Sequence, residues 1–88
     1  MIIERNVILK NSKGLHARPA AIVVNKAKSF KSEITISKDT DTVNAKSIMG
    51  VLMLAAPSGT SLSLRAEGDD AQLAIDELSK IIEGDMEY

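Results

Sequence analysis

The sequence predicts an α+β fold in which helices cover one face of a β-sheet and the other face is open to solvent. Segments of alternating and helical periodicity follow one another in the order β-α-β-β-α-β-α. Each of the four expected strands is half polar, which is typical of a sheet with one solvated face. The 88 residues leave no room for a linker or a repeat, so we expect a single domain over residues 1–88.

The first strand and the first helix are separated by a polar loop that contains a glycine. The expected strand covers Ile2–Leu9, with Val7 and Leu9 on its buried face. A helix is expected from Ala17, because Pro19 suits a first helical turn, where its missing N–H would have no partner. The apolar stripe of this helix has helical spacing and consists of Ala20, Val23, Val24 and Ala27.

The next two strands are expected to form a hairpin. The segment Glu33–Ser37 alternates strictly, with Ile34 and Ile36 on the buried face. A polar turn follows, and the short segment Thr42–Ala45 places Val43 inward.

A second helix is expected over Ser47–Ala56, with Ser47 as its N-cap and Pro57 at its end. Its apolar side chains cover most of its circumference. Val51, Leu54 and Ala55 share one face of this helix, and Ile48, Met49 and Leu52 share another.

The C-terminal third predicts a strand, a tight turn and a helix. Leu62, Leu64 and Ala66 alternate with polar residues, and this is the clearest strand pattern of the chain. Asp69 and Gln72 resemble a capping box for a helix. The apolar stripe of that helix consists of Ala71, Ala74, Ile75, Leu78, Ile81 and Ile82. Gly84 is expected to cap its C-terminus, and Asp85–Tyr88 is expected to fray.

The composition excludes several classes of function. The net charge of -1 and the scarcity of aromatic residues (Phe30 and Tyr88) argue against a nucleic-acid partner. A chain with no cysteine and one histidine has neither a disulfide framework nor a thiolate or imidazole metal cluster, so we expect no metal and no cofactor. The N-terminus does not resemble a signal peptide, and no apolar run is long enough to span or insert into a membrane. We therefore expect a cytoplasmic protein.

The single histidine, His16, is the strongest candidate for a reactive residue. It precedes a helix, where unpaired backbone N–H groups and the helix dipole favour an anion. A neutral imidazole is nucleophilic near neutral pH, and the N–H groups of Ala17 and Arg18 could bind a phosphoryl group attached to it. A surface histidine without a role is the alternative interpretation. We favour a phosphorylated histidine because Gly14 precedes it and Arg18 follows it.

For Arg18 and for the second helix, a functional and a purely structural interpretation are also both possible. The charge of Arg18 opposes the dipole at a helix start, and its guanidinium suits phosphate oxygens, but the residue could also be a solvated arginine. The apolar excess of the second helix predicts either complete burial or an exposed patch that binds a partner, formed by Ile48, Met49 and Leu52. We favour the patch.

Two motifs resemble the HPr family, the histidine-containing phosphocarrier proteins of the bacterial phosphoenolpyruvate-dependent sugar phosphotransferase system. GLHARPA (14–20) resembles the active-site signature of the family, and AKSIMGVLML (45–54) resembles its regulatory-serine signature. The segment APSG (56–59) departs from the pattern, because many members have a glycine-rich stretch there. Length and element order also match, so the resemblance covers essentially the whole chain.

The resemblance implies an open-faced β-sandwich with an antiparallel sheet in the order 1-4-2-3 and three helices on one face. It implies that His16 accepts a phosphoryl group from enzyme I on Nδ1 and passes it to IIA components of sugar transporters. Arg18 would be the active-site arginine, and Ser47 would be phosphorylated by an ATP-dependent HPr serine kinase/phosphorylase. Ile48, Met49 and Leu52 would be the docking patch. The protein would be a monomeric carrier, not an enzyme.

Three alternatives stay open. The chain could be a nitrogen-branch paralogue, or a regulatory binding module that acts through Ser47 and its helix. An α/β-sandwich RNA-binding domain is a third possibility, against which the charge and the missing aromatic residues argue. His16 argues against the catabolite-repression paralogue that lacks the histidine. The roles of the acidic tail Glu83–Tyr88 and the identity of the sugars are not predicted.

Overall fold

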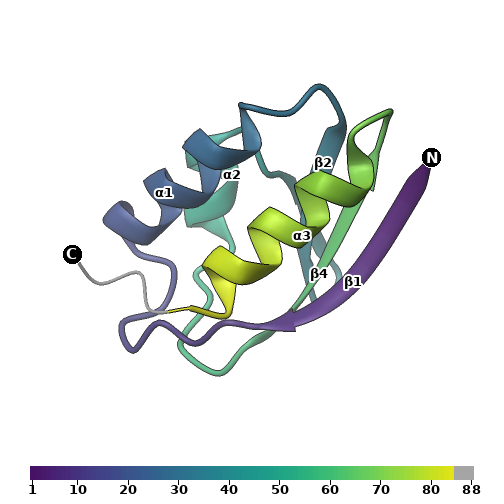
Figure 1. Ribbon diagram of the computed structural model, residues 1–88. Coiled ribbons are helices and arrows are strands. Elements are labelled where there is room, and N and C mark those ends of the chain that lie inside the picture. The colour runs from purple at the N-terminus through teal and green to yellow at the C-terminus, as the bar shows by residue number, and fades with distance from the viewer. Residues whose placement is uncertain (85–88) are drawn as a thin grey trace.

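The computed structural model describes residues 1–84, and the fraying expected for Asp85–Tyr88 lies outside this range. The element order is the predicted one (Figure 1). The elements are β1 (Ile2–Ile8), α1 (Ala17–Ala27), β2 (Glu33–Lys38), β3 (Asp41–Asn44), α2 (Ile48–Met53), β4 (Ser61–Glu67) and α3 (Ala71–Ile82).

The four strands form one antiparallel sheet in the order β1-β4-β2-β3. Val7 pairs with Leu62, and Leu64 pairs with Ile36, so the inward residues of neighbouring strands are aligned. The helices lie on one side of the sheet (Figure 1). The predicted open-faced β-sandwich with the order 1-4-2-3 is therefore confirmed.

The core lies between the sheet and the helices, and it is aliphatic except for Phe30, which is 8% exposed. All four residues of the predicted stripe on α1 are buried, as are Ile34, Ile36 and the inward residues of β4. In β1, Val7 is 1% exposed while its neighbour Ile8 is 39% exposed. The alternation in the sequence therefore identified the buried face of each strand correctly.

The predicted second helix was too long. α2 ends at Met53, and Ala55 has a φ of +48°, a left-handed conformation in which a helix terminates. The following carbonyl, of Ala56, accepts a hydrogen bond from the amide of Leu15 at 2.9 Å. Ala55 is therefore exposed outside the helix and does not share the buried face of Val51 and Leu54, which are 0% and 2% exposed.

The predicted N-cap of α3 was also wrong, and its C-cap lies one residue earlier than predicted. The N-cap is Asp70, not Asp69, and Gln72 donates a hydrogen bond to Asp76 at 3.0 Å. The carboxylate of Asp70 makes no capping bond, because it accepts hydrogen bonds from the loop before β2. At the other end the C-cap is Glu83, one residue before the expected Gly84.

Three strands differ slightly in length or position from the prediction, and one of them is β2, which extends to Lys38 instead of ending at Ser37. β1 ends at Ile8, one residue earlier than expected, and β3 covers Asp41–Asn44 instead of Thr42–Ala45. The amide of Ala45 still donates to the carbonyl of Ile34 at 2.9 Å, so the hairpin continues slightly beyond β3. Such shifts do not change which side chains face the helices.

Candidate functional site

His16 is the N-cap of α1. Its backbone is extended (φ −90°, ψ −170°), and its carbonyl accepts the hydrogen bond of the Ala20 amide at 2.9 Å. The imidazole is exposed and makes no capping hydrogen bond. No acidic residue lies in the first turn of the helix. The ring therefore lies at the electropositive end of a helix, as predicted.

The backbone before His16 is held by contacts with the segment that follows α2. Gly14 has a φ of +73°, and a Cβ atom at this position would lie 2.5 Å from the carbonyl oxygen of Ala56. The Leu15 amide donates to that same oxygen, and the Leu15 side chain is only 5% exposed. Glycine is therefore required at position 14 both for the backbone conformation and for the close approach.

Ala17 and Arg18 occupy the first turn of α1, directly after His16. Both residues are exposed. Residues 16–18 thus place an imidazole, the first backbone amides of α1 and a residue with a guanidinium group at the start of one helix. Such a combination can bind the oxygens of a phosphoryl group.

Ser47 is the N-cap of α2, as the sequence predicted. Its hydroxyl oxygen accepts a hydrogen bond from the Gly50 amide at 3.1 Å, and the residue is half-buried. α1 and α2 pack against each other, so the two sequence motifs lie on neighbouring helices (Figure 1).

Two of the three residues of the predicted patch on α2 are exposed. Ile48 and Met49 are 39% and 66% exposed, whereas Leu52 is partly buried and packs against the core. Met53, which is 76% exposed, was not predicted to belong to this patch. Its position four residues after Met49 places it on the same side of the helix, and this spacing was the available signal. We call Ile48, Met49, Leu52 and Met53 the α2 patch.

Two carboxyl groups with a lowered pKa lie on or next to α3, and both serve the fold. The Ser32 hydroxyl, the Lys31 amide and the Ser32 amide donate to Asp70 and lower its pKa. A hydrogen bond from the Arg5 guanidinium at 2.8 Å is the main cause of the lowered pKa of Asp76.

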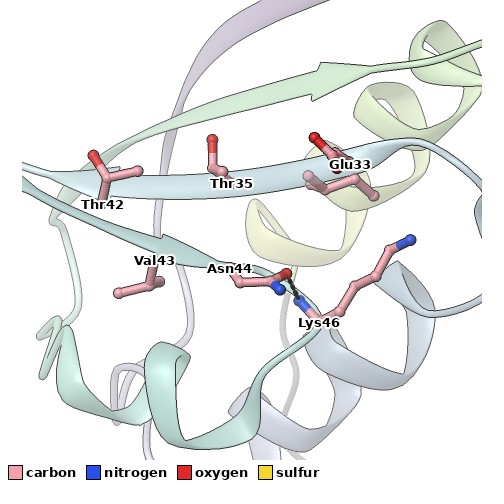
Figure 2. A pocket seen from close by; sticks show the side chains of 7 residues that line it. Glu33, Thr35, Thr42, Val43, Asn44 and Lys46 are labelled. Atoms are coloured by element: carbon pink, nitrogen blue, oxygen red, sulfur yellow. Dashed lines mark hydrogen bonds between the residues drawn. The ribbon is translucent and has the colours of Figure 1, made fainter.

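A shallow hollow lies between β2 and β3, and it contains none of the predicted site residues (Figure 2). Lys46 at its rim donates from Nζ to the carbonyl of Phe30 at 2.8 Å. Its backbone amide donates to the side chain of Asn44 at 2.9 Å, the dashed line in Figure 2. The ammonium group of Lys46 is thus engaged in holding the chain between α1 and β2.

Within residues 1–84, no group of three or more histidine, cysteine, aspartate or glutamate side chains is arranged to hold a metal ion. None of the helices in this range is long and apolar enough to span a membrane.

The comparison with protein families defines the class of this protein. Residues 3–84 match a family model described as "PTS HPr component phosphorylation site". The match covers both sequence motifs and nearly all of the described fold. The chain belongs to the HPr family, whose members are phosphocarriers of the phosphotransferase system rather than enzymes.

The relatives include two kinds of protein. The chain is 41% identical to the phosphocarrier protein HPr of Treponema pallidum, over 98% of each chain. It is 49% identical to the HPr-like protein Crh of Halalkalibacterium halodurans, over 93% of this chain and 98% of the relative. The crystal structure of HPr from Bacillus anthracis has a TM-score of 0.90 and 41% identity, covering 92% of this chain and 96% of the other.

Dimers occur among the similar structures. The HPr dimer from Thermoanaerobacter tengcongensis is 49% identical, with a TM-score of 0.74 over 88% of each chain. The expectation of a monomer therefore stays a prediction for this chain.

Proposed function

We propose that this protein accepts a phosphoryl group from phospho-enzyme I on Nδ1 of His16 and passes it to IIA components of sugar transporters. The observation that carries this proposal is the exposed imidazole at the N-cap of α1, which makes no capping hydrogen bond. An imidazole that neither caps the helix nor is buried is available to a large partner. Membership of the HPr family supports the same role.

The transfer is a displacement at phosphorus. The lone pair of Nδ1 attacks the phosphorus atom, the new N–P bond forms, and the donor's leaving group departs with the electrons of the bond that breaks. The proton on the other ring nitrogen need not move during this step. Transfer to the next acceptor is the same reaction with His16 as the leaving group.

The start of α1 supplies electrostatic stabilisation for the phosphoryl group. The amides of Ala17 and Arg18 belong to the first helical turn, at the end of a helix that favours an anion. The Arg18 guanidinium adds a positive charge and a forked set of donors. Because the site is exposed, this stabilisation is moderate, which suits a group that must be passed on.

The α2 patch is proposed as the docking surface for these partners. Met49 and Met53 are largely exposed, and methionine adapts to differently shaped surfaces. Ser47 lies at the start of the same helix and is proposed as the target of an HPr serine kinase/phosphorylase. A phosphate there would place a dianion at the rim of an apolar contact, where it would oppose docking.

A regulatory binding module is the second candidate, and the similarity to HPr-like protein Crh favours it. In that case Ser47 and α2 would carry the function, and His16 would be dispensable. The presence of His16 together with Arg18 favours the carrier. In either role we propose a soluble, cytoplasmic monomer, and light scattering of the purified chain tests the oligomeric state.

The direct test is labelling with enzyme I and radioactive phosphoenolpyruvate. The parent chain and Ser47→Ala should be labelled, and the label should be lost in acid and stable in base. His16→Ala should not be labelled. Label on His16→Ala, or none on the folded parent, would contradict the carrier proposal. Labelling of Ser47 by kinase and ATP in a parent that enzyme I does not label would favour the regulatory module.

A further inference from the structure

Asn11 is buried in the loop that precedes His16, and its polar side chain is only half satisfied. The residue is 0% exposed. Its Nδ2 atom donates a hydrogen bond of 2.7 Å to the carbonyl oxygen of Gly14. Its Oδ1 atom has no hydrogen-bond partner among the described residues. Buried polar side chains are rarely left in this state, so its presence requires an explanation.

The hydrogen bonds of Asn11 lead directly to the backbone of His16. The Gly14 amide donates to the Asn11 carbonyl at 3.1 Å, so the loop is closed by both the backbone and the side chain of Asn11. The Gly14 carbonyl that accepts from Asn11 also accepts from the His16 amide at 3.1 Å. Asn11 therefore fixes the carbonyl that holds the backbone of His16.

The same peptide is also anchored from its other end. The Leu15 amide donates to the Ala56 carbonyl, and Gly14 packs against the same oxygen. This contact sets the distance of the loop from the end of α2. The Leu15 amide and the Gly14 carbonyl belong to one planar peptide, so Ala56 holds this peptide at its N–H end and Asn11 holds it at its C=O end. The Asn11 hydrogen bond is the side-chain contact of this arrangement, and it acts on the carbonyl to which the His16 amide donates.

From this geometry we infer that Asn11 is a positioning residue for phosphoryl transfer by His16, acting through the Gly14 carbonyl. The inference rests on the proposed function of His16. The unpaired Oδ1 atom opposes stability and offsets what the bond to Gly14 contributes. A side chain that contributes little net stability and fixes the backbone of the reacting residue serves the site rather than the fold.

The test compares Asn11→Ala and Asn11→Asp with Asn6→Ala as the matched control. Asn11→Ala removes the donor, and Asn11→Asp keeps the shape but puts an acceptor against the Gly14 carbonyl. Asn6 is an exposed asparagine on β1. Both Asn11 variants should lower the kcat of transfer about three- to tenfold while the KM for phospho-enzyme I stays unchanged. Asn6→Ala should behave like the parent.

Amide hydrogen exchange on the folded proteins gives a second readout that needs no phosphoryl transfer. The His16 and Gly14 amides should exchange faster in the Asn11 variants. The Leu9 amide, which donates to Thr60 at 2.9 Å, should exchange at the parental rate. If these amides exchange faster in the Asn11 variants but enzyme I does not label the parent, the role of Asn11 in the loop is supported. The carrier function proposed for His16 is then refuted.

Either of two results would overturn the inference. One is a parental kcat in both Asn11 variants, and the other is an unchanged exchange rate at His16 and Gly14. If the parental kcat came with a raised KM, Asn11 would act on docking instead of transfer. If one variant does not fold, the other still decides between these outcomes.

Discussion

The two roles proposed for Ser47, capping α2 and controlling docking, can be separated by two substitutions. Ser47→Ala removes the hydroxyl that accepts the Gly50 amide at 3.1 Å and adds no charge. Ser47→Asp retains an oxygen acceptor at the N-cap and adds a negative charge beside the α2 patch. Ser47→Ala should lower the stability of the protein, and Ser47→Asp should weaken the docking of the partner.

The magnitude for Ser47→Ala follows from the lost cap. Replacing an N-cap serine by alanine costs about 1 kcal/mol. For 88 residues the entropy of unfolding is about 0.18 kcal/mol/K, so we expect the Tm to fall by about 5 °C. The loss should not be larger, because buried Val51 and Leu54 still hold α2 and the residues just after it on the core. Aspartate is as good an N-cap as serine, so Ser47→Asp should stay within about 2 °C of the parent.

For the kinetics of transfer, we expect the larger effect from Ser47→Asp and not from Ser47→Ala. Ser47→Ala should be phosphorylated by enzyme I with parental parameters. Ser47→Asp should raise the KM about tenfold with little change in kcat, because a charge at the rim of an apolar contact weakens docking.

Thermal unfolding followed by circular dichroism, and transfer kinetics on the same preparations, measure both effects. A parental KM for Ser47→Asp would refute the assignment of α2 as the docking surface. An equal rise in KM for Ser47→Ala would show that loosening of the helix, not charge, is responsible. A parental Tm for Ser47→Ala would mean that the cap contributes nothing to stability.

Three further predictions address other parts of the molecule. Arg18→Ala should slow transfer at least about tenfold, because its proposed partner is a charged phosphoryl group. The Tm should change only slightly, because the residue is exposed and surface substitutions have small effects on stability. A parental rate would make it a surface arginine only. Met53→Gln should raise the KM about threefold, whereas Leu73→Gln, an equally conservative change of an exposed apolar residue on α3, should not; equal effects would argue against a patch confined to α2. The pKa of Asp70 is lowered by its hydrogen bonds, first of all that from Ser32, so its contribution to stability is present above about pH 4 and is lost as the pH falls through the lowered pKa. Asp70→Asn should therefore lower the Tm at pH 7, with a difference from the parent that shrinks below about pH 4; a difference independent of pH would contradict this reasoning.

The buried face of each element could be predicted from the sequence because periodicity reports it directly. A strand that is half buried alternates, and a helix on a sheet has a stripe at helical spacing, as Ile34 and Ile36 or Val23 and Ala27 illustrate. The location of His16 at the start of α1 followed from Pro19 and from the change of period after the polar loop. The strand order came from the resemblance to a family, since periodicity does not specify which strands pair.

Features that depend on contacts between distant segments could not be predicted. α2 ends at Met53 although Leu54, Ala55 and Ala56 favour a helix, because the Ala56 carbonyl bonds to Leu15. Asp70 does not cap α3 with its side chain, because two amides and a hydroxyl of the loop 31–32 compete for its carboxylate. In both cases the competing partner lies about forty residues away in the sequence, beyond the range of any local pattern.

The early end of α2 connects the two motifs of the chain. A helix continued through Ala56 would keep that carbonyl directed along its own axis, and it would not be available to Leu15. The left-handed turn at Ala55 instead turns the chain so that Ala56 anchors the loop before His16, and Gly14 permits the close approach. The Leu15–Ala56 hydrogen bond and the close approach of Gly14 therefore connect the end of α2 to the loop before His16, and the packing of α1 on α2 adds to this connection. Val51 and Leu54 fix α2 and the residue after it to the core. A partner that docks on the proposed surface of α2 would thus meet the imidazole at a defined place, and we expect a charge at Ser47 to oppose such docking without altering the loop that carries His16.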